Sequence, residues 1–221
     1  MAGRISITES TYRTLTERVL SGAIPPGARV DANELAAASG VSPTPVRNAL
    51  NRLAGAGLLV SHSNEGFFVP LWSEQDLRDL YDCSAALLGL AIARAASART
   101  SSKAITVQDT LTDEGVELRT EATFRKIMSL CVNKRLRAVL VDISLRLRPV
   151  RVLEGEWIAN RDTELRRILL AFDALDLSKL DRLVNAYHRR RIRLAPKIVA
   201  RMQDHETRPV IDGAQPAGEG V

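Results

Sequence analysis

The chain has 221 residues, 45% of them hydrophobic and 26% charged, so it is long enough to form two small globular domains that each bury a core. Its net charge of +5 is compatible with a nucleic-acid partner, but residues 1–72 hold six arginines against five acidic residues, a net charge of only +1. Net charge therefore cannot identify the class of binding partner, which has to be inferred from the pattern of residues along the chain.

The first predicted elements are a helix and a short strand. Residues 8–23 are predicted to form a helix in which Leu15, Val19 and Leu20 face inward. The Pro-Pro-Gly segment at residues 25–27 ends this helix, because proline cannot continue one. Residues 28–30 are expected to add an edge strand to a hairpin that follows further along the chain.

A short helix and a tight turn are predicted next. Asn33 can cap this helix, whose apolar side consists of Leu35, Ala36 and Ala38. Gly40 supplies the backbone freedom that the turn needs.

A longer helix then begins at Ser42 and Pro43, which suit the N-cap and the first helical position. Its apolar residues recur at helical spacing and predict a buried stripe made of Val46, Ala49, Leu50 and Leu53. The opposite face offers Thr44, Pro45, Arg47, Asn48, Asn51 and Arg52.

This opposite face has the chemistry of base recognition. Arg47 could donate two hydrogen bonds to a guanine, and Asn48 or Asn51 could read an adenine. Backbone amides from Thr44 onward could hold a phosphate at the start of the helix.

A β-hairpin follows directly, with residues 58–61 and 67–69 as its strands and residues 62–66 as its tip. Gly66 permits a positive φ and a close approach to a nucleic-acid backbone. Helix, turn, longer helix and hairpin in this order predict a winged helix-turn-helix, whose second helix enters the DNA major groove. The alternative is a three-helix domain that binds a protein.

The sequence of about residues 10–70 resembles the N-terminal domain of GntR-family transcription regulators. The resemblance implies contacts with DNA for Thr44, Arg47 and Gly66. The family usually has an arginine where this chain has Pro43, so one phosphate or base contact is expected to be missing. The matching pieces are Ile24–Gly27, Glu34–Ala36, Val41-Ser42, Thr44–Arg47, Ala49-Leu50, Leu53, Gly57-Leu58 and Gly66–Val69. The complete predicted set of DNA-binding residues is Arg29, Ser42, Thr44, Arg47, Asn48, Asn51, Arg52, His62 and Gly66.

Residues after 70 have the periodicity of helices and no strand pattern. Ser73 and Asp76 are expected to start a helix that runs to about Ala98, whereas residues 103–119 give no clear period. Further helices are predicted at 120–131, 133–148, 160–175 and 178–202. The core face of the helix at 133–148 is predicted to consist of Leu136, Val139, Leu140, Ile143 and Leu147.

The two cysteines, Cys83 and Cys131, lie in apolar helical segments and are predicted to be buried, reduced thiols. Neither a secretory signal nor an apolar run of membrane length is expected, so a cytoplasmic protein with no membrane partner is predicted.

The region of about residues 74–200 resembles the ligand-sensing domain, called FCD, of the FadR branch of the same family. The matching pieces are Asp76–Tyr81, Phe124–Ile127 with Asn133–Leu136, Glu164–Leu169 and Tyr187-His188. Most FCD domains bind a divalent metal through one Asp and three His, and the metal holds a small organic acid. The resemblance aligns these ligands with Glu121, Arg125, Leu165 and His188, too few donors for a transition-metal site, so neither a metal nor another cofactor is expected.

An effector pocket is predicted to consist of Glu121, Arg125, Arg146, Glu164 and His188. In one interpretation, Arg125 takes the place of the metal and binds a carboxylate effector directly, assisted by Arg146 and His188. In the other, Arg125 pairs with Glu121 or Glu164 and fills the old cavity as a structural ion pair. A basic run at residues 188–201 is predicted to be a solvated helix face, with a second DNA patch as the alternative.

The sequence thus predicts a mainly α protein with a winged helix-turn-helix DNA-binding domain at 1–72, a helical sensing and dimerising domain at 73–206 and a disordered tail at 207–221. We expect a homodimeric repressor that binds a double-stranded DNA operator and responds to a small carboxylate. The alternative is a regulator that has lost metal and small-molecule sensing and depends on a protein partner or on no ligand. An enzyme is not expected, because no nucleophile–base pair or phosphate-binding loop is present.

Overall fold

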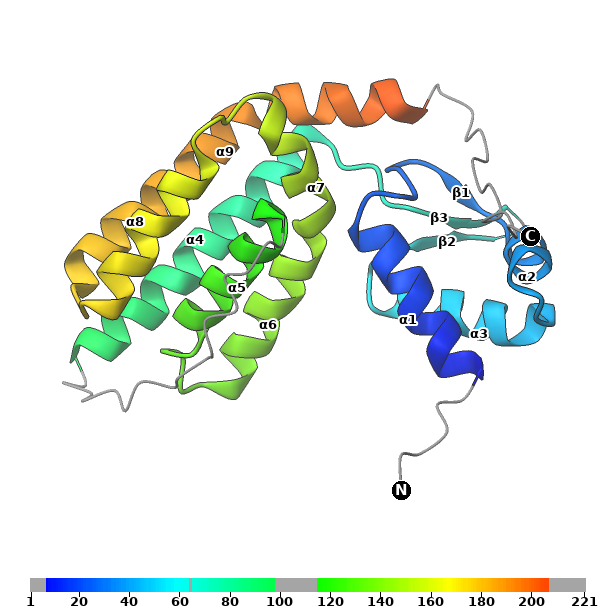
Figure 1. Ribbon diagram of the computed structural model, residues 1–221, viewed down its shortest axis with the longest axis horizontal. Helices are drawn as coiled ribbons and strands as arrows, with labels where there is room; N and C mark the ends of the chain where they lie inside the picture. The colour runs from blue at the N-terminus through cyan, green and yellow to red at the C-terminus, as the bar shows by residue number, and fades with distance from the viewer. Residues whose placement is uncertain (1–6, 64, 98–114, 207–221) are drawn as a thin grey trace, which may run out of the picture.

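The computed structural model describes residues 7–63, 65–97 and 115–206, and the predicted tail at 207–221 lies outside them. The N-terminal part is a helix-turn-helix with a small sheet, and the rest is helical (Figure 1). The elements up to residue 68 are α1 (Ile7–Leu20), β1 (Arg29–Val30), α2 (Ala32–Ser39), α3 (Pro43–Gly55), β2 (Val60–His62) and β3 (Gly66–Phe68). The helical elements are α4 (Glu74–Ser97), α5 (Val116–Met128), α6 (Lys134–Arg146), α7 (Arg148–Leu153), the 3₁₀ turn η1 (Glu154–Glu156), α8 (Arg161–Asp173) and α9 (Leu177–Glu206). The predicted fold class is confirmed.

The core of the N-terminal part forms where α1 crosses α3. Leu15, Val19 and Leu20 of α1 are buried, as predicted, and the apolar stripe of α3 is completely buried against them. Each large aliphatic side chain buried in this way contributes about 1.5–3 kcal/mol, so this contact fixes α3 relative to α1. The stripe consists of Val46, Ala49, Leu50 and Leu53, each 0% exposed.

The turn between α2 and α3 matches the prediction, but the cap of α2 does not. Gly40 has a φ of +64°, the left-handed conformation that glycine adopts without strain. The predicted N-cap Asn33 lies inside α2, and Asp31 caps the helix instead by accepting hydrogen bonds from the amides of Asn33 and Glu34. Asp31 is the last extended residue after β1, which is the backbone conformation an N-cap needs. The predicted apolar side is also narrower, because Ala38 is exposed.

The three strands form an antiparallel sheet in the order β1-β3-β2, so the predicted edge strand is confirmed. Val60 pairs with Phe68, Ser61 with Phe67 and His62 with Gly66. His62 and Gly66 therefore belong to the strands, and the predicted tip at 62–66 is too long. The turn needs fewer residues because Gly66, with a φ of +103°, resumes the ladder immediately.

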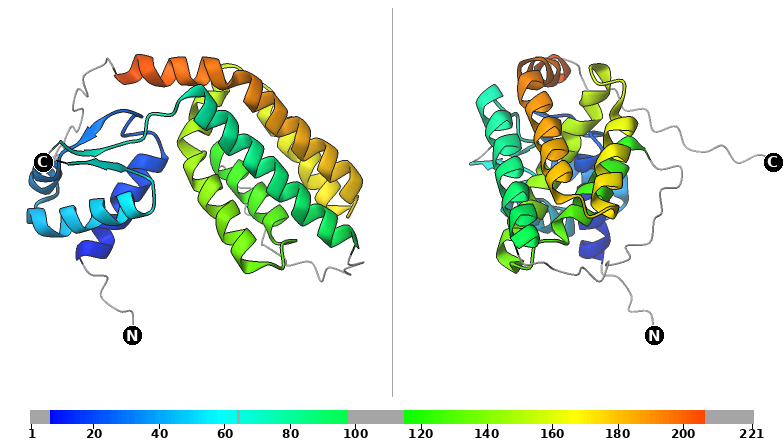
Figure 2. Two further views of the ribbon diagram at one scale, coloured as in Figure 1. Left: turned by 180° about the vertical axis from the view of Figure 1, so that it is seen from behind. Right: turned by 90° about the vertical axis from the view of Figure 1, so that its left-hand side faces the viewer.

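The helix α4 begins at a reciprocal cap, as predicted. The amide of Asp76 donates to the Ser73 hydroxyl at 3.1 Å, and the Ser73 amide donates to the Asp76 carboxylate at 3.0 Å. The Ser73 hydroxyl also donates to this carboxylate at 2.6 Å, and this hydrogen bond, together with the one from the Ser73 amide, lowers the pKa of Asp76 below its usual value. α4 then packs along α9, and the two helices lie side by side in Figure 2.

Two expectations about α4, that no apolar run reaches membrane length and that Cys83 is buried, are wrong. By length and composition alone, α4 is long and apolar enough to span a membrane. In this fold Leu77, Tyr81 and Leu88 are buried inside the helical bundle, so α4 serves as a core helix. Its opposite face remains exposed and includes Cys83, which was predicted to be buried; the other cysteine, Cys131, is buried.

The remaining helices correspond to α5, α6, α8 and α9, although α5 begins at Val116, inside the segment that gave no clear period. α7 and η1 were not predicted as separate elements. Val139, predicted in the core face of α6, is 47% exposed, because the neighbouring helices cover only one side of α6. Residues 98–114, which include most of the segment 103–119, lie outside the described residues.

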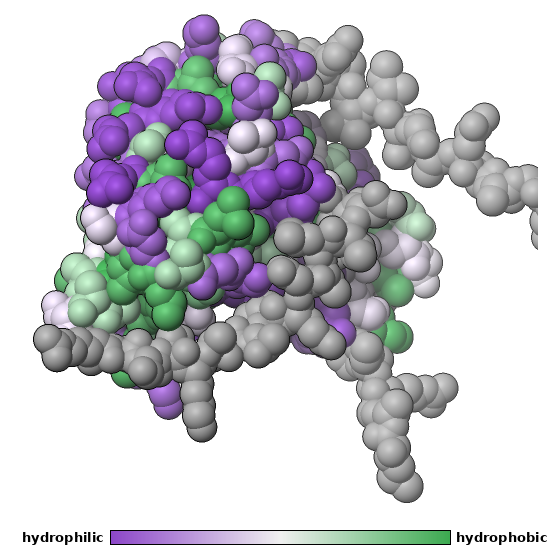
Figure 3. All heavy atoms as spheres, turned by 60° about the vertical axis from the view of Figure 1, so that its left-hand side comes forward, coloured by the Kyte–Doolittle hydropathy of each residue, from purple (hydrophilic) through white to green (hydrophobic). Residues whose placement is uncertain are grey.

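α9 is the longest helix and contains Pro196. The ribbon bends along α9, and its final turns run above the N-terminal part (Figure 1), where Met202 lines a small cavity together with Val19 and Pro26. On the face drawn in Figure 3, hydrophilic residues cover most of the surface and apolar residues gather in its lower part.

Candidate nucleic-acid interface and helical core

The face of α3 opposite its buried stripe carries a row of exposed polar side chains. The row consists of Thr44, Arg47, Asn48 and Asn51, which follow the i, i+3, i+4, i+7 spacing of one helix face. Because the stripe on the other side is fully buried, the row is held outward by the core of the N-terminal part. These side chains offer the donors and acceptors that read base edges in a major groove.

The start of α3 suits a phosphate. Ser42 is the N-cap in extended conformation, as predicted, and Pro43 takes the first helical position. The Ser42 side chain makes no capping hydrogen bond, so it does not occupy the backbone amides of the first turn, which a phosphate could contact. Ser42 and Thr44 are both exposed beside these amides.

Arg47 is held by the preceding helix. Its guanidinium lies 3.5 Å from the side-chain oxygen of Asn33 on α2. Asp31 lies close by, and hydrogen bonds from the amides of Glu34 and Asn33 lower the pKa of its carboxyl group. The guanidinium of Arg47 is therefore positioned in front of α3 by a weak polar contact that a stronger acceptor, such as a guanine base, could replace.

The hairpin is braced from β1. The Nε of Arg29 donates to the carbonyl oxygen of Glu65 at 3.0 Å, which ties β1 to the turn between β2 and β3. His62 packs edge-on against Phe68, with ring centroids 5.2 Å apart, and remains exposed. Arg29 of β1 thus lies beside the hairpin that carries His62 and Gly66, as expected for a wing.

Arg52 does not join the exposed row, although it was predicted among the DNA-binding residues. Its guanidinium pairs with Glu9 at 3.0 Å and stacks over the ring of Tyr12, 3.9 Å from the ring centroid. Both partners lie on α1, so α1 neutralises this arginine and turns it away from Arg47. We therefore expect Arg52 to contribute less to DNA binding than Arg47.

In the helical part, His188 lies in the core with 2% exposure. Its Nδ1 lies 2.7 Å from the carbonyl oxygen of Val184, and its Nε2 lies 3.0 Å from the Ser84 hydroxyl. Because a carbonyl oxygen can only accept, Nδ1 carries the proton and Nε2 accepts from Ser84. Burial lowers the pKa of His188 to about 3, so the imidazole is neutral at ordinary pH.

A charged network surrounds this histidine. Arg191 is 1% exposed, and it pairs with Glu154 at 3.0 Å and with Glu164 at 2.8 Å. The Tyr81 hydroxyl donates to the other oxygen of Glu154 at 2.5 Å, and the guanidinium of Arg191 lies over the ring of Tyr187. Residues 188–201 are therefore not a uniformly solvated basic face, because His188 and Arg191 point inward.

Of the five predicted effector-pocket residues, only Glu164 and His188 belong to this core. Arg125 is 63% exposed at the surface, where it pairs with Glu121 at 2.7 Å. Arg146 points toward the N-terminal part and lies in its own pair with Asp142 at 2.8 Å. The predicted pocket is thus not assembled as proposed, because α5 turns the side chain of Arg125 outward.

Comparison with known proteins agrees with this geometry. Residues 7–69 match the family described as "Bacterial regulatory proteins, gntR family". The chain is 32% identical over 145 residues to the Nta operon transcriptional regulator of Aminobacter aminovorans, an alignment that covers 62% of this chain and 68% of that protein. The chain belongs to the GntR family. As a GntR regulator it is a transcription regulator and not an enzyme, and regulators of this family bind DNA operators.

Two further proteins are also similar to this chain. The "Probable D-xylose utilization operon transcriptional repressor" of Paenarthrobacter nicotinovorans is 35% identical over 88 residues, which cover 40% of this chain and 39% of that protein. The solved structure of E. coli McbR/YncC superposes with a TM-score of 0.63 over 88% of this chain and 99% of that chain, at 21% identity. The structural likeness extends the shared fold from the GntR helix-turn-helix into the helical part.

The residues aligned with metal ligands do not fit a metal. Leu165 is apolar, Arg125 is a cation and Glu121 is occupied by arginines. Both ring nitrogens of His188 already have hydrogen-bond partners. Across the described ranges, no group of three or more His, Cys, Asp or Glu side chains is placed to hold a metal ion. That this GntR chain uses no metal remains a prediction, now supported by the chemistry of its donors.

The core residues Glu154 and Arg191 were missed, because Arg191 was assigned to the solvated basic face at 188–201 and no element was predicted around Glu154. Arg191 follows Val184 by seven positions and His188 by three, which places it on the buried stripe of α9. That spacing could have identified Arg191 as an inward residue.

Proposed function

We propose that this GntR regulator is a homodimeric cytoplasmic repressor that binds a double-stranded DNA operator through α3 and the wing. The observation that carries the proposal is the exposed row of α3, held outward by a fully buried stripe and flanked by the hairpin. Repression is proposed because the related protein of P. nicotinovorans is named a repressor. A cytoplasmic location fits the free, exposed thiol of Cys83, which needs a reducing compartment.

Weak charge favours a dimeric DNA-binding form. The segment 1–72 has a net charge of only +1, and Glu9 neutralises Arg52 further. Because nucleic-acid affinity depends on the number of phosphates that are neutralised, one copy would bind DNA weakly and two copies would double the contacts. Two half-sites about one helical turn apart are therefore expected in the operator.

The outward face of α4 is suited to a second copy of the chain. Cys83, Ala86, Leu90 and Ala93 are exposed on it, and Leu90 is 42% exposed. These small and apolar side chains leave a flat helix face that a second α4 could cover. Leu90→Glu should convert the dimer to a monomer in sedimentation equilibrium, whereas Leu170→Glu, at a 61% exposed position of α8, should not. A monomeric wild-type protein would refute the dimer.

We also propose that the helical part is an FCD-type sensor of a small carboxylate. Two buried donors support this proposal, because the Tyr187 hydroxyl and the Nε of Arg151 have no hydrogen-bond partner among the described residues. Both residues contact Phe124, so they lie in one neighbourhood. A carboxylate could accept from both donors and remove the cost of leaving them unpaired.

A thermal-shift screen with small carboxylic acids tests the sensor. An acid that binds should raise the melting temperature with or without chelator, and Arg151→Gln and Tyr187→Phe should each reduce the shift. Arg125→Ala is the matched control, because Arg125 is exposed and should leave the shift unchanged. A shift that disappears with chelator would overturn the metal-free site.

A ligand-independent regulator is the second candidate, and the charged core favours it. Arg191 and Arg151 balance Glu154 and Glu164, so this core has no excess positive charge to attract an acid. If no acid shifts the melting temperature while operator binding is normal, this second candidate is the correct one.

The DNA-binding proposal is tested by selecting binding sequences from a random duplex library. The expected result is a two-fold symmetric site with two half-sites. Recovery of unrelated sequences, with binding that depends on salt alone, would refute sequence-specific recognition.

A further inference from the structure

The N-terminal part touches the helical part at Met202 of α9 and along a short segment, residues 145–149, which we call the elbow. It joins the end of α6 to the start of α7. Leu145 packs against the core cluster of the N-terminal part, and Pro149 lines a small cavity with Val19 of α1. The two arginines between them, Arg146 and Arg148, make the polar contacts.

Arg148 bridges the two parts. Its Nη2 lies 3.0 Å from a carboxylate oxygen of Glu17 on α1, and its Nε lies 3.7 Å from a carboxylate oxygen of Glu121 on α5. The side chains of Arg148 and Glu121 are only 14% and 16% exposed, whereas Glu17 is 64% exposed. The arginine is therefore anchored in the helical part, and the solvent-exposed contact to Glu17 is the weaker side of the bridge.

Arg146 contacts the turn that joins α3 to the wing. Two hydrogen bonds to Asp142, at 2.8 and 3.3 Å, fix its guanidinium. The guanidinium covers Gly57, where an added Cβ would lie 2.7 Å from its Cζ. Gly57 also has a φ of +69°, so its backbone favours glycine, and an added Cβ would in addition displace the guanidinium of Arg146. The turn that connects the recognition helix to the wing thus rests directly on the helical part.

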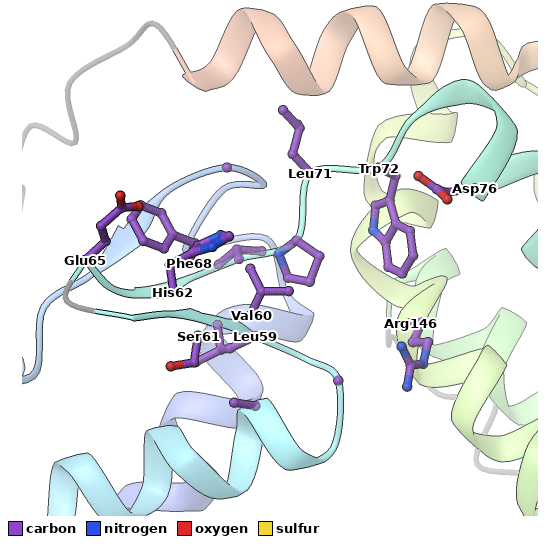
Figure 4. A pocket seen from close by; sticks show the side chains of 15 residues that line it. Leu59, Val60, Ser61, His62, Glu65, Phe68, Leu71, Trp72, Asp76 and Arg146 are labelled. Carbon is purple, nitrogen blue, oxygen red and sulfur yellow. The ribbon is translucent and has the colours of Figure 1, made fainter.

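The two parts are separated on the wing side. A groove of about 840 Å³ lies there, with Val60 and Leu71 on one side and Trp72 and Arg146 on the other (Figure 4). Contact at the elbow and open space beside the wing allow the N-terminal part to tilt without disturbing either core.

We propose that Arg146 and Arg148 are positioning residues that set the angle at which α3 and the wing are presented to DNA. The contact of Arg146 with Gly57 is the point about which the N-terminal part can rotate relative to the helical part. The contact of Arg148 with Glu17 limits this rotation. In a dimer this angle determines the distance between the two recognition helices, so the elbow selects the half-site spacing. This inference rests on the proposed dimeric DNA binding.

The angle is measured within one copy of the full-length chain. Spin labels at Ser39→Cys on α2 and Lys179→Cys on α9 report the distance between the two parts in a Cys83→Ser background. Labelled chains are mixed with an excess of unlabelled protein, so that pairs between copies are rare. Glu17→Gln and Arg148→Gln should broaden or shift the distance distribution, and Arg148→Lys should restore most of it.

Glu74→Gln is the matched control, because it removes an ion pair with Arg78 that lies entirely within α4. It should leave the distribution unchanged. Glu17 is an exposed residue, so Glu17→Gln remains informative even if a variant of Arg148 fails to fold. The same distribution for Glu17→Gln and the wild type would overturn the proposal.

A second readout uses operator duplexes that differ only in half-site spacing. Glu17→Gln should change or flatten the spacing preference, while its affinity for a single half-site stays at the wild-type value. An unchanged preference would count against the elbow. If the wild type binds no duplex, the proposed function fails, and the spin-label distances still decide whether the elbow sets the angle.

Discussion

The buried imidazole of His188 makes the stability of the helical part depend on pH. Its neutral form donates to Val184 and accepts from Ser84, and a second proton on Nε2 would break the contact with Ser84. Burial lowers the folded-state pKa to about 3. The unfolded chain has the ordinary value of about 6.5.

The sign follows from proton binding. Between pH 6.5 and 3 the unfolded state binds a proton that the folded state does not, so stability is complete above pH 6.5 and is lost as the pH falls through this window. With about 1.36 kcal/mol per pH unit, the loss between pH 7 and pH 5 is about 2 kcal/mol. This figure depends little on the folded-state pKa, because pH 5 lies well above it.

Urea unfolding at pH 7 and pH 5 measures this loss, followed by the fluorescence of Trp72 and Trp157, which both pack in the helical part. The free energy of unfolding of the wild type should fall by about 2 kcal/mol more than that of His188→Gln. Carboxylate titrations are common to both proteins and cancel in this difference. His62→Gln, at an exposed position of the wing, should behave as the wild type. Equal pH dependence in His188→Gln and the wild type would refute the buried neutral imidazole.

Two further predictions concern stability and are measured by urea unfolding. Glu154→Gln should cost about 3–5 kcal/mol, because it leaves the charge of Arg191 buried with a weaker partner, and adding Arg191→Met should recover most of the loss. If Glu154→Gln alone is as stable as the wild type, the buried ion pair of Glu154 and Arg191 does not contribute to stability as argued. Asp31→Ala should cost about 1 kcal/mol through loss of the cap of α2, whereas Asn33→Ala should cost little. If Asn33→Ala costs more stability than Asp31→Ala, Asn33 is the cap of α2 after all.

The helix-turn-helix could be predicted closely from the sequence because its signals are local. The apolar spacing of α3, the glycine at the turn and the Ser42-Pro43 start each depend on a few neighbouring residues. The cap of α2 was misassigned because Asp31 and Asn33 are both good caps, and only the backbone conformation after β1 decides between them.

The helical core could not be predicted to the same degree because its contacts join distant segments. Tyr81, Glu154 and Arg191 meet from α4, η1 and α9, and no local pattern links them. The position of Arg125 was inferred from a resemblance, which does not fix the side on which α5 presents it. The elbow contacts likewise depend on how two separately packed cores meet.

The central claim is that α3 and the wing read operator DNA, and Arg47→Ala tests it most directly. Fluorescence anisotropy with the selected operator should show a loss of about 1–3 kcal/mol for Arg47→Ala and weaker discrimination at one base position in each half-site. Arg52→Ala, which removes an arginine held by Glu9 on α1, should keep the wild-type discrimination. If Arg47→Ala binds the operator and its base variants as the wild type does, α3 is not the reading helix and the claim is wrong.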